Sequence, residues 1–230
     1  MDQWGNITAG TELIRRVEGG EAHGLAAPLV TTASGAKLGK TEGGAVWLDP
    51  EITSPYKLYQ FCINVDDRDV ESYLKIFTFL SSDDIANALA AHGKDRGARI
   101  PQQALARDFT ARVHGAATAE RVRHASRIMF GEADPREADA ATWDMLAREV
   151  PHAPLQNGLE IPVSAVDLVA GSSLAKSKGE ARRLLSQGGV SLNGRPLAAD
   201  ATVGAADVLP GGYLWLRRGK KSDFIFTTAP

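Results

Sequence analysis

Apolar side chains recur at helical spacing through the middle of the chain, between residues 61 and 150. Val70, Tyr73, Leu74 and Phe77 fall at positions i, i+3, i+4 and i+7, which places them on one face of a helix. Three more stripes follow: Ile85 and Leu89 after the start signal Ser81-Ser82-Asp83-Asp84; Leu105, Phe109 and Val113; and Val122, Ala125 and Met129. The pattern predicts a small bundle of helices.

The first 60 residues have a different character. They are rich in Gly and Thr, and their apolar runs are short. Residues 29–32 and 46–48 favour extended pieces, and residues 33–44 have no period and predict a loop. Ser54-Pro55 then predicts the start of a helix.

The end of the chain predicts a compact module after a linker at residues 151–160. Ser177 and Glu180 have the spacing of a capping box. Asn193-Gly194 is the favoured two-residue turn of a β-hairpin. Leucines at 214 and 216 and phenylalanines at 224 and 226 alternate on either side of a basic turn, which indicates two more strands.

Composition places the chain among ordinary globular proteins, with 230 residues, 43% apolar and 23% charged. No apolar run approaches the roughly 20 residues that span a bilayer, and we expect no signal peptide at the N-terminus. Cys62 is the single cysteine, so an intrachain disulfide is impossible and we expect a reducing cytosol. Its apolar neighbours favour a buried small hydrophobe over a nucleophile.

The net charge of −2 hides an uneven distribution. Residues 161–230 hold nine Lys and Arg against five Asp and Glu, a net +4, and the rest of the chain carries −6. A basic tail on an acidic body indicates a polyanionic partner. The cations of interest are Lys176, Lys178, Arg182, Arg183, Arg217, Arg218, Lys220 and Lys221. They form a phosphate-binding surface if the helix and the hairpin that carry them face the same way, and a solvated rim if they do not.

Two lysines stand three residues apart in Lys37-Leu38-Gly39-Lys40-Thr41. Ammonium groups on a glycine-flanked loop suit a polyphosphate, because they neutralise the charge that builds on the β- and γ-phosphates as pyrophosphate leaves. The glycines also allow the backbone to approach the phosphates. The loop is not a Walker loop, because Ser34 stands where the first glycine is required. Taken alone, the pentapeptide favours a solvated surface loop over a phosphate-binding one.

Four motifs, in order along the chain, resemble bacterial tyrosyl-tRNA synthetases. They are Asp2 to Gly10, the lysine loop 37–41, Ser54 to Phe61, and Asp66 to Val70. The tail is similar to the RNA-binding fold of ribosomal small-subunit protein four, which ends these synthetases. The resemblance implies an α/β remnant of a class I, Rossmann-type catalytic domain at residues 1–60. It implies an α-helical, anticodon-side bundle at 61–150, a linker at 151–160, and a small α+β RNA-binding domain (αL) at 161–230.

The resemblance also implies roles for single residues. Lys40 would contact ATP, Lys37 would assist the departure of pyrophosphate, and Thr41 belongs to the same ATP-binding signature. Asp2 matches the acid that binds the ribose of the adenylate. Gln3 matches the amide near the reacting carboxylate and α-phosphate. The reaction would join tyrosine to tRNA-Tyr through tyrosyl-adenylate, with ATP arriving as its magnesium complex and no metal site in the protein.

The family pattern is incomplete in this sequence. Class I synthetases carry an H-x-G-H signature early in the catalytic sheet, and none of the five histidines stands in one. The tyrosine-selecting residues precede the position matched by Asp2. We therefore expect a truncated synthetase, an internal start or one piece of a split protein, inactive alone because aligning the substrates supplies much of the rate. The family is a homodimer, with its contact surface largely in the missing half.

Two other functions compete with this one. A stand-alone tRNA- or RNA-binding protein needs only the basic tail. A pseudouridine synthase bearing the same tail would need a catalytic Asp in an Arg-Leu-Asp context, which the sequence does not contain.

Overall fold

The computed structural model describes residues 2–27, 29–36, 38, 45–155, 160–219 and 222–228. The chain divides into two compact units, residues 1–45 and 46–230. Within the described residues, no helix is long and apolar enough to cross a membrane.

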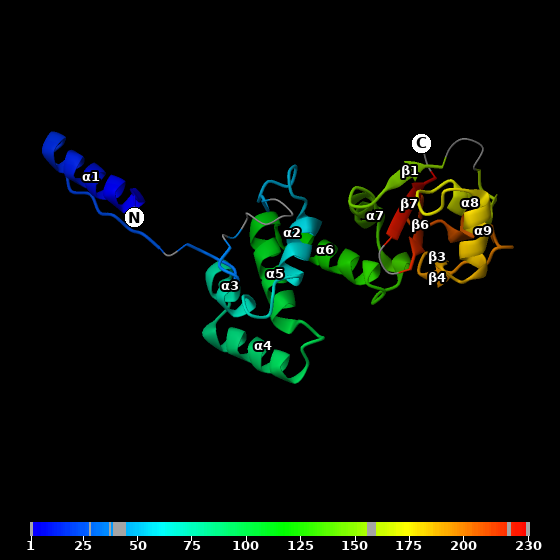
Figure 1. The fold of residues 1–230 in the computed structure, drawn as a ribbon, viewed down its shortest axis with the longest axis horizontal. Coiled ribbons are helices and arrows are strands. Elements are labelled where there is room, and N and C mark those ends of the chain that lie inside the picture. Colours follow the sequence, from blue (N-terminus) through cyan, green and yellow to red (C-terminus); the bar gives the residue numbers. More distant parts are fainter. Residues whose placement is uncertain are drawn as a thin grey trace. The chain divides into compact units, whose positions relative to one another are not determined.

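The first unit is built on α1 (Asp2–Val17), a helix that the Gly- and Thr-rich sequence did not predict. The chain after α1 doubles back along it, so that Gly20 lies beside Ile14 and Gly24 lies beside Ile7 (Figure 1). Five large apolar side chains of this unit are more than half exposed: Trp4, Leu13, Val17, Leu25 and Leu29. Its described residues form no regular strand, so the predicted α/β character of residues 1–60 stays a prediction.

Five helices open the second unit: α2 (Pro55–Ile63), α3 (Val70–Phe77), α4 (Ser82–Lys94), α5 (Ile100–His114) and α6 (Ala116–Met129). They confirm the helical bundle. The predicted stripe of α3 is buried at Val70, Tyr73 and Leu74. The predicted start signal is also confirmed, because the Ser81 hydroxyl accepts a hydrogen bond from the Asp84 N–H at 3.1 Å. Gly115, at φ 89°, ends α5.

The C-terminal part contains a short helix, α7 (Ala140–Ala147), and a five-stranded sheet in the order β1-β7-β6-β3-β4. These strands are β1 (His152–Pro154), β3 (Val190–Leu192), β4 (Arg195–Pro196), β6 (Tyr213–Arg218) and β7 (Ser222–Thr227). Strand β1 pairs in parallel with β7. Part of the segment predicted as a linker is therefore an edge strand, because its extended backbone satisfies the open edge of β7.

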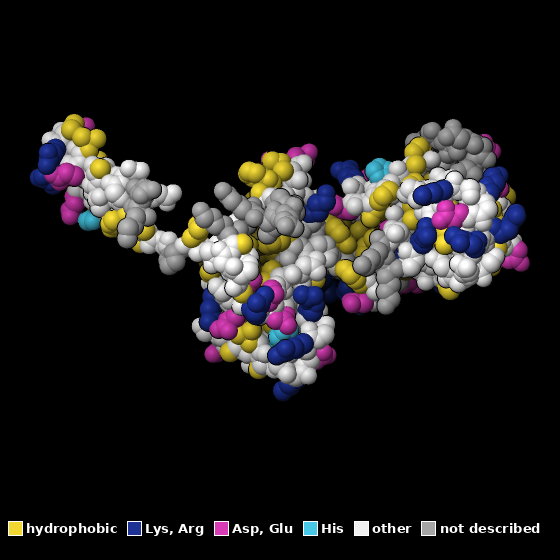
Figure 2. All heavy atoms as spheres, viewed as in Figure 1, with side chains coloured by type: hydrophobic (Ala, Val, Ile, Leu, Met, Phe, Trp, Pro, Cys, Tyr) yellow, Lys and Arg dark blue, Asp and Glu magenta, His cyan; other side chains and the backbone are white. Residues whose placement is uncertain are grey.

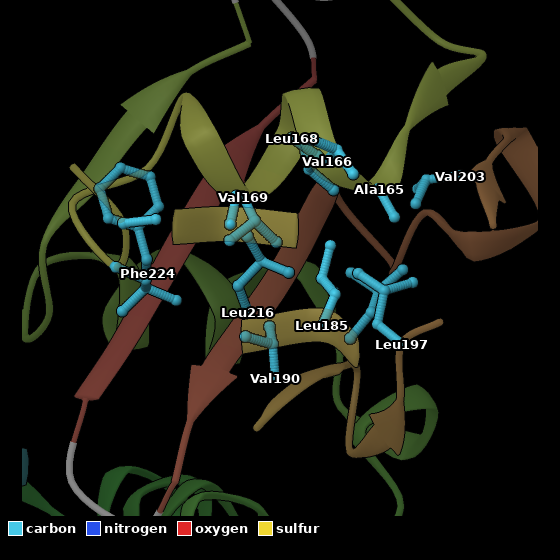
Figure 3. Close-up of a cluster of buried hydrophobic side chains, with 14 of the residues drawn as sticks. Ala165, Val166, Leu168, Val169, Leu185, Val190, Leu197, Val203, Leu216 and Phe224 are labelled. Carbon is cyan, nitrogen blue, oxygen red and sulfur yellow. The ribbon is translucent and has the colours of Figure 1, made fainter. Parts of the chain in front are cut away.

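The sheet is covered on both faces. On one face α8 (Ala165–Ala170) and α9 (Lys178–Ser186) pack through Leu168, Val169 and Leu185 onto Leu216 and Phe224 (Figure 3). A second, two-stranded sheet of β2 (Val163–Ser164) and β5 (Thr202–Val203) closes the edge of this core.

On the other face, Trp143 of α7 is fully buried against the sheet. Its ring lies 6.3 Å from that of Tyr213 and 6.0 Å from that of Trp215, and Ile128 of α6 joins the same cluster. Because both faces are covered, the first four residues of β6 are all buried, which a half-exposed strand would not allow.

Candidate functional site

Helix α9 carries the predicted basic residues on its exposed side. The Ser177 hydroxyl caps it by accepting a hydrogen bond from the Glu180 N–H at 3.2 Å, so the predicted helix start is confirmed. Ala181, Leu184 and Leu185 are buried against the sheet. The intervening positions must then point outward, which leaves Arg182 and Arg183 exposed to solvent.

Two cations on or beside α9, Lys178 and Arg218, form ion pairs with carboxylates. The Lys178 ammonium lies 2.6 Å from Asp167, and this contact is the main cause that lowers the pKa of the Asp167 carboxyl. Arg218 donates to the carbonyl of Leu174 at 2.8 Å and lies 3.5 Å from Glu180. A hydrogen bond from the backbone N–H of Lys176 is the main cause that lowers the pKa of Glu180. These contacts hold Arg218 of the hairpin beside α9.

Lys176, Arg182 and Arg183 make no ion pair within 4 Å among the residues described by the structure. With Lys178 and Arg218 they form a surface that we call the basic face. Figure 2 shows Lys and Arg side chains gathered around a small acidic patch where α8 and α9 lie. A guanidinium group can donate two parallel hydrogen bonds to phosphate oxygens. Arg182 and Arg183 are therefore the strongest candidates of this face for contact with a phosphate backbone.

Arg217 points to the other side of the sheet, because successive residues of a strand alternate between its faces. Its guanidinium bonds Asp223 at 2.8 Å, lies 4.7 Å from the Trp215 ring, and is only 19% exposed. The Trp215 indole donates to the same carboxylate at 2.8 Å. The structure therefore separates Arg217 from the basic face. Lys220 and Lys221 lie outside the described residues.

The predicted ATP-binding residues belong to the first unit. Gln3 lies on the first turn of α1 with an exposed side chain, whereas the side chain of Asp2 is not described. Lys37, Lys40 and Thr41 lie outside the described residues. Next to them, the Thr32 N–H bonds the carbonyl of Ala36 at 2.8 Å and the Leu38 N–H bonds that of Val30 at 3.2 Å. These bonds form a tight turn that leads into the lysine loop.

Two other kinds of site, a metal centre and a reactive thiol, were considered among the described residues. They contain no group of three or more His, Cys, Asp or Glu side chains that could hold a metal ion. Cys62 is buried, as predicted, and burial raises the pKa of its thiol to about 12. A thiol that stays protonated at neutral pH is a poor nucleophile.

Comparison with known proteins identifies the class. A family model described as tRNA synthetases class I (W and Y) matches residues 1–131. A second model, described as the Tyrosine--tRNA ligase SYY-like C-terminal domain, matches residues 144–226. The chain belongs to the class I tRNA synthetases of the tryptophan and tyrosine group, which confirms the resemblance of its motifs.

The individual relatives are tyrosine–tRNA ligases. The one from Anaeromyxobacter dehalogenans (strain 2CP-1) is 53% identical, over 96% of this chain and 53% of its own length. Those of Leifsonia xyli and Bacteroides fragilis (strain ATCC 25285) are 51% and 46% identical, over 96% and 97% of this chain and 49% and 54% of theirs. This chain thus spans about half the length of the curated relatives it matches.

Two of the solved structures with a similar sequence are fungal mitochondrial tyrosyl-tRNA synthetases, each truncated at the C-terminus. The Coccidioides posadasii structure is 37% identical over 53% of this chain and 36% of that chain, with a TM-score of 0.44. The Aspergillus nidulans structure is 39% identical over 39% and 25%, with a TM-score of 0.38.

Proposed function

We propose that this chain supplies the lysine loop and the tRNA-binding half of a tyrosine–tRNA ligase, which attaches tyrosine to tRNA-Tyr through tyrosyl-adenylate. The observation that carries the proposal is the order of the two family matches, a class I synthetase model followed by the C-terminal domain of tyrosine–tRNA ligases. The domain layout proposed with it follows the sequence prediction: catalytic residues at 1–60, the helical anticodon-side domain at 61–150, and RNA binding at 161–230.

The ATP side of the reaction falls to five residues of the first unit. In this proposal Lys40 contacts ATP and Lys37 draws charge from the departing pyrophosphate, with Thr41 in the same loop. Asp2 holds the ribose and Gln3 lies near the attacking carboxylate. An oxygen of the tyrosine carboxylate attacks the α-phosphorus; a carboxylate oxygen–phosphorus bond forms, the bond from the α-phosphorus to the bridging oxygen breaks, and pyrophosphate leaves with that oxygen. Magnesium arrives with ATP as part of the substrate.

The RNA side falls to the basic residues of the C-terminal part. Arg182 and Arg183 are exposed on the basic face, which also carries Lys176, Lys178 and Arg218. An RNA backbone that crosses α9 would therefore contact several cations at once. Lys220 and Lys221 extend the proposed surface along the hairpin, whereas Arg217, which the sequence grouped with them, is paired with Asp223 on the opposite face of the sheet. We also propose a cytoplasmic location and, for the assembled enzyme, a homodimer.

The catalytic half of the proposal is tested by adding the part of a relative that this chain does not span. The chain is mixed with the N-terminal half of the Anaeromyxobacter dehalogenans ligase, and tyrosine-dependent exchange of pyrophosphate into ATP is measured. We expect exchange from the mixture, none from either half alone, and a loss of at least about 100-fold with Lys40→Ala. The matched control, Lys94→Ala, should exchange normally. A mixture without exchange, or one that tolerates Lys40→Ala, contradicts the proposal.

A stand-alone RNA-binding protein is the second candidate, favoured by the two unpaired arginines of α9. In that case the chain binds tRNA without catalysis. Replacing Arg182 and Arg183 with alanine should weaken tRNA binding and lower the slope of log K against log salt by about 2, because each lost phosphate contact contributes about 1. Arg148→Ala, which removes an exposed arginine paired with Asp144 on α7, is the control. Binding that does not depend on salt would rule out this surface.

A further inference from the structure

Among the described residues, one ion pair joins the helical bundle to the C-terminal part of the second unit. The Lys57 ammonium of α2 lies 3.6 Å from a carboxylate oxygen of Glu149, a residue that follows α7. No other cation of the described residues lies within 4 Å of this carboxylate. The two residues are distant in the chain, so no sequence pattern groups them.

The burial of Glu149 distinguishes this ion pair from those on the surface. The Glu149 side chain is only 7% exposed, whereas that of Lys57 is 63% exposed. A carboxylate that is covered from water costs free energy unless a cation compensates its charge. Without Lys57, separating the two parts would return the carboxylate to water and relieve that cost. The ion pair therefore stabilises the joined arrangement, whereas exposed pairs within one helix contribute little.

Each partner of the ion pair is fixed within its own part of the unit. On the bundle side, the Gln60 side chain of α2 donates a hydrogen bond to the Ser126 hydroxyl of α6 at 2.8 Å, which ties α2 to α6. On the other side, the backbone just after Glu149 is held on the sheet, because the Pro151 carbonyl accepts from the Ile225 N–H at 3.1 Å. A rotation of one part against the other must therefore break the ion pair.

Tyr56, next to Lys57 in the chain, adds an apolar contact at the same junction. It packs against the buried cluster under the sheet, which Ile128 of α6 also joins. Burial is the main cause that raises the pKa of the Tyr56 phenol, and the carboxylates of Glu149 and Asp223 raise it further. The first turn of α2 therefore contacts the C-terminal part through both an ion pair and an aromatic ring.

The chain passes from the bundle to the C-terminal part only once, through residues 130–139. A single crossing acts as a hinge, and the two parts move relative to each other unless a further contact prevents it. We infer that Lys57, Glu149 and Tyr56 are positioning residues that lock this hinge and hold the basic face at a fixed angle to the bundle.

The inference rests on the RNA side of the proposed function, in which the bundle and the basic face contact the same tRNA. When the two surfaces are held together, the second contact forms at a high effective concentration, and the tRNA is bound more tightly than by either surface alone. A broken lock lowers this effective concentration without removing any group that contacts RNA.

The first experiment tests the lock without RNA, by hydrogen exchange of the 230-residue chain followed by mass spectrometry. Lys57→Ala should speed exchange of the α7 amides at least about tenfold and leave those of α5 unchanged, because the uncompensated carboxylate favours separation of the two parts. Lys57→Arg keeps the charge and should exchange as the parent does. Lys75→Ala, which breaks an exposed pair with Glu71 inside α3, is the matched control and should not change α7.

The second experiment measures binding of tRNA-Tyr and of a minimal RNA hairpin that is too short to reach both parts. Glu149→Gln should weaken tRNA binding about tenfold and leave binding of the hairpin unchanged. The direction of the change is decisive. If Glu149 acted only through its charge, its removal would strengthen binding to RNA, because the acid repels phosphates.

The inference is overturned if Glu149→Gln binds tRNA as well as the parent or better, or if Lys57→Ala and Lys75→Ala show the same exchange at α7. Hairpin binding that falls as far as tRNA binding would report a general loss of the fold and would also overturn it. A parent that binds no tRNA would remove the positioning role together with the RNA side of the proposed function, whereas hydrogen exchange reports on the ion pair alone. Pyrophosphate exchange in the reconstituted mixture reports separately on the ligase proposal.

Discussion

Replacing Trp143 with alanine should remove much of the stability of the C-terminal part. The side chain is fully buried, its ring stacks near Tyr213 and Trp215, and its indole N–H bonds the carbonyl of Pro135 at 3.3 Å. A buried tryptophan covers about 200 Å². At about 25 cal/mol per Å² this area accounts for about 5 kcal/mol, an upper bound because the unfolded chain already buries part of it.

The expected loss is therefore about 4 kcal/mol in the free energy of unfolding, in the range measured for Trp-to-Ala changes in cores. Trp143→Phe keeps most of the ring but leaves the Pro135 carbonyl without its donor, and should cost about 1.5 kcal/mol. Urea unfolding followed by far-ultraviolet circular dichroism measures both changes. Trp47, which is more than half exposed, provides the control, and Trp47→Ala should change stability by less than about 0.5 kcal/mol.

A loss below about 1 kcal/mol for Trp143→Ala would refute the reasoning. It would mean that α7 does not cover the sheet in solution, and the burial of both faces of β6 would have to be abandoned. Equal losses at Trp143 and Trp47 would have the same meaning, because the argument depends on the difference in burial.

Two further predictions concern Cys62 and Asn193. At pH 8 the Cys62 thiol should react with a disulfide reagent at least about 100-fold faster in urea than in water, because the native thiol is both covered and protonated. Since burial raises its pKa from 9.0 to about 12, its contribution to stability is complete below pH 9 and is lost as pH rises towards 12, a trend that Cys62→Ala should abolish. Asn193→Ala should cost about 3 kcal/mol in urea unfolding, because it removes bonds to the Trp215 N–H and the Asp207 carbonyl at a left-handed position. Asn193→Gly should recover only the part of this loss that comes from the left-handed backbone, because glycine adopts a positive φ without strain but makes neither hydrogen bond. Equal stability of the alanine and glycine variants would contradict a backbone contribution.

The sequence predicted the elements that are stabilised by interactions between residues close together in the chain. The stripe of α3 and the capping serines of α4 and α9 each act within one turn of helix, so the sequence shows them directly. The Asn193-Gly194 turn is confirmed by positive φ at both residues, as a two-residue hairpin requires.

Elements stabilised by distant partners escaped prediction. Trp143 packs on residues about 70 positions further along, and neither α7 nor its place on the sheet can be inferred from its eight residues alone. Strand β1 depends in the same way on the open edge of β7. Helix α1 contains Gly5, Gly10 and two threonines, which are weak helix formers, so propensity argued against it.

The candidate site was likewise predicted only in part. Residue types and order identified the lysine loop and the basic cluster, but not which cations share a surface. Arg217 and Arg218 are neighbours in the chain and lie on opposite faces of β6, a separation that strand alternation could have predicted.

The two covered faces of the C-terminal sheet bear on how the protein can be dissected. A fragment that begins at residue 161, where the sequence places the start of the RNA-binding domain, would lack both α7 and β1. Tyr213, Trp215 and Ile225 would then meet water, and β7 would offer a bare edge to other molecules. Expression trials that begin upstream of Ala116, before α6, keep this covering together with Ile128 and should yield monodisperse material where shorter pieces precipitate.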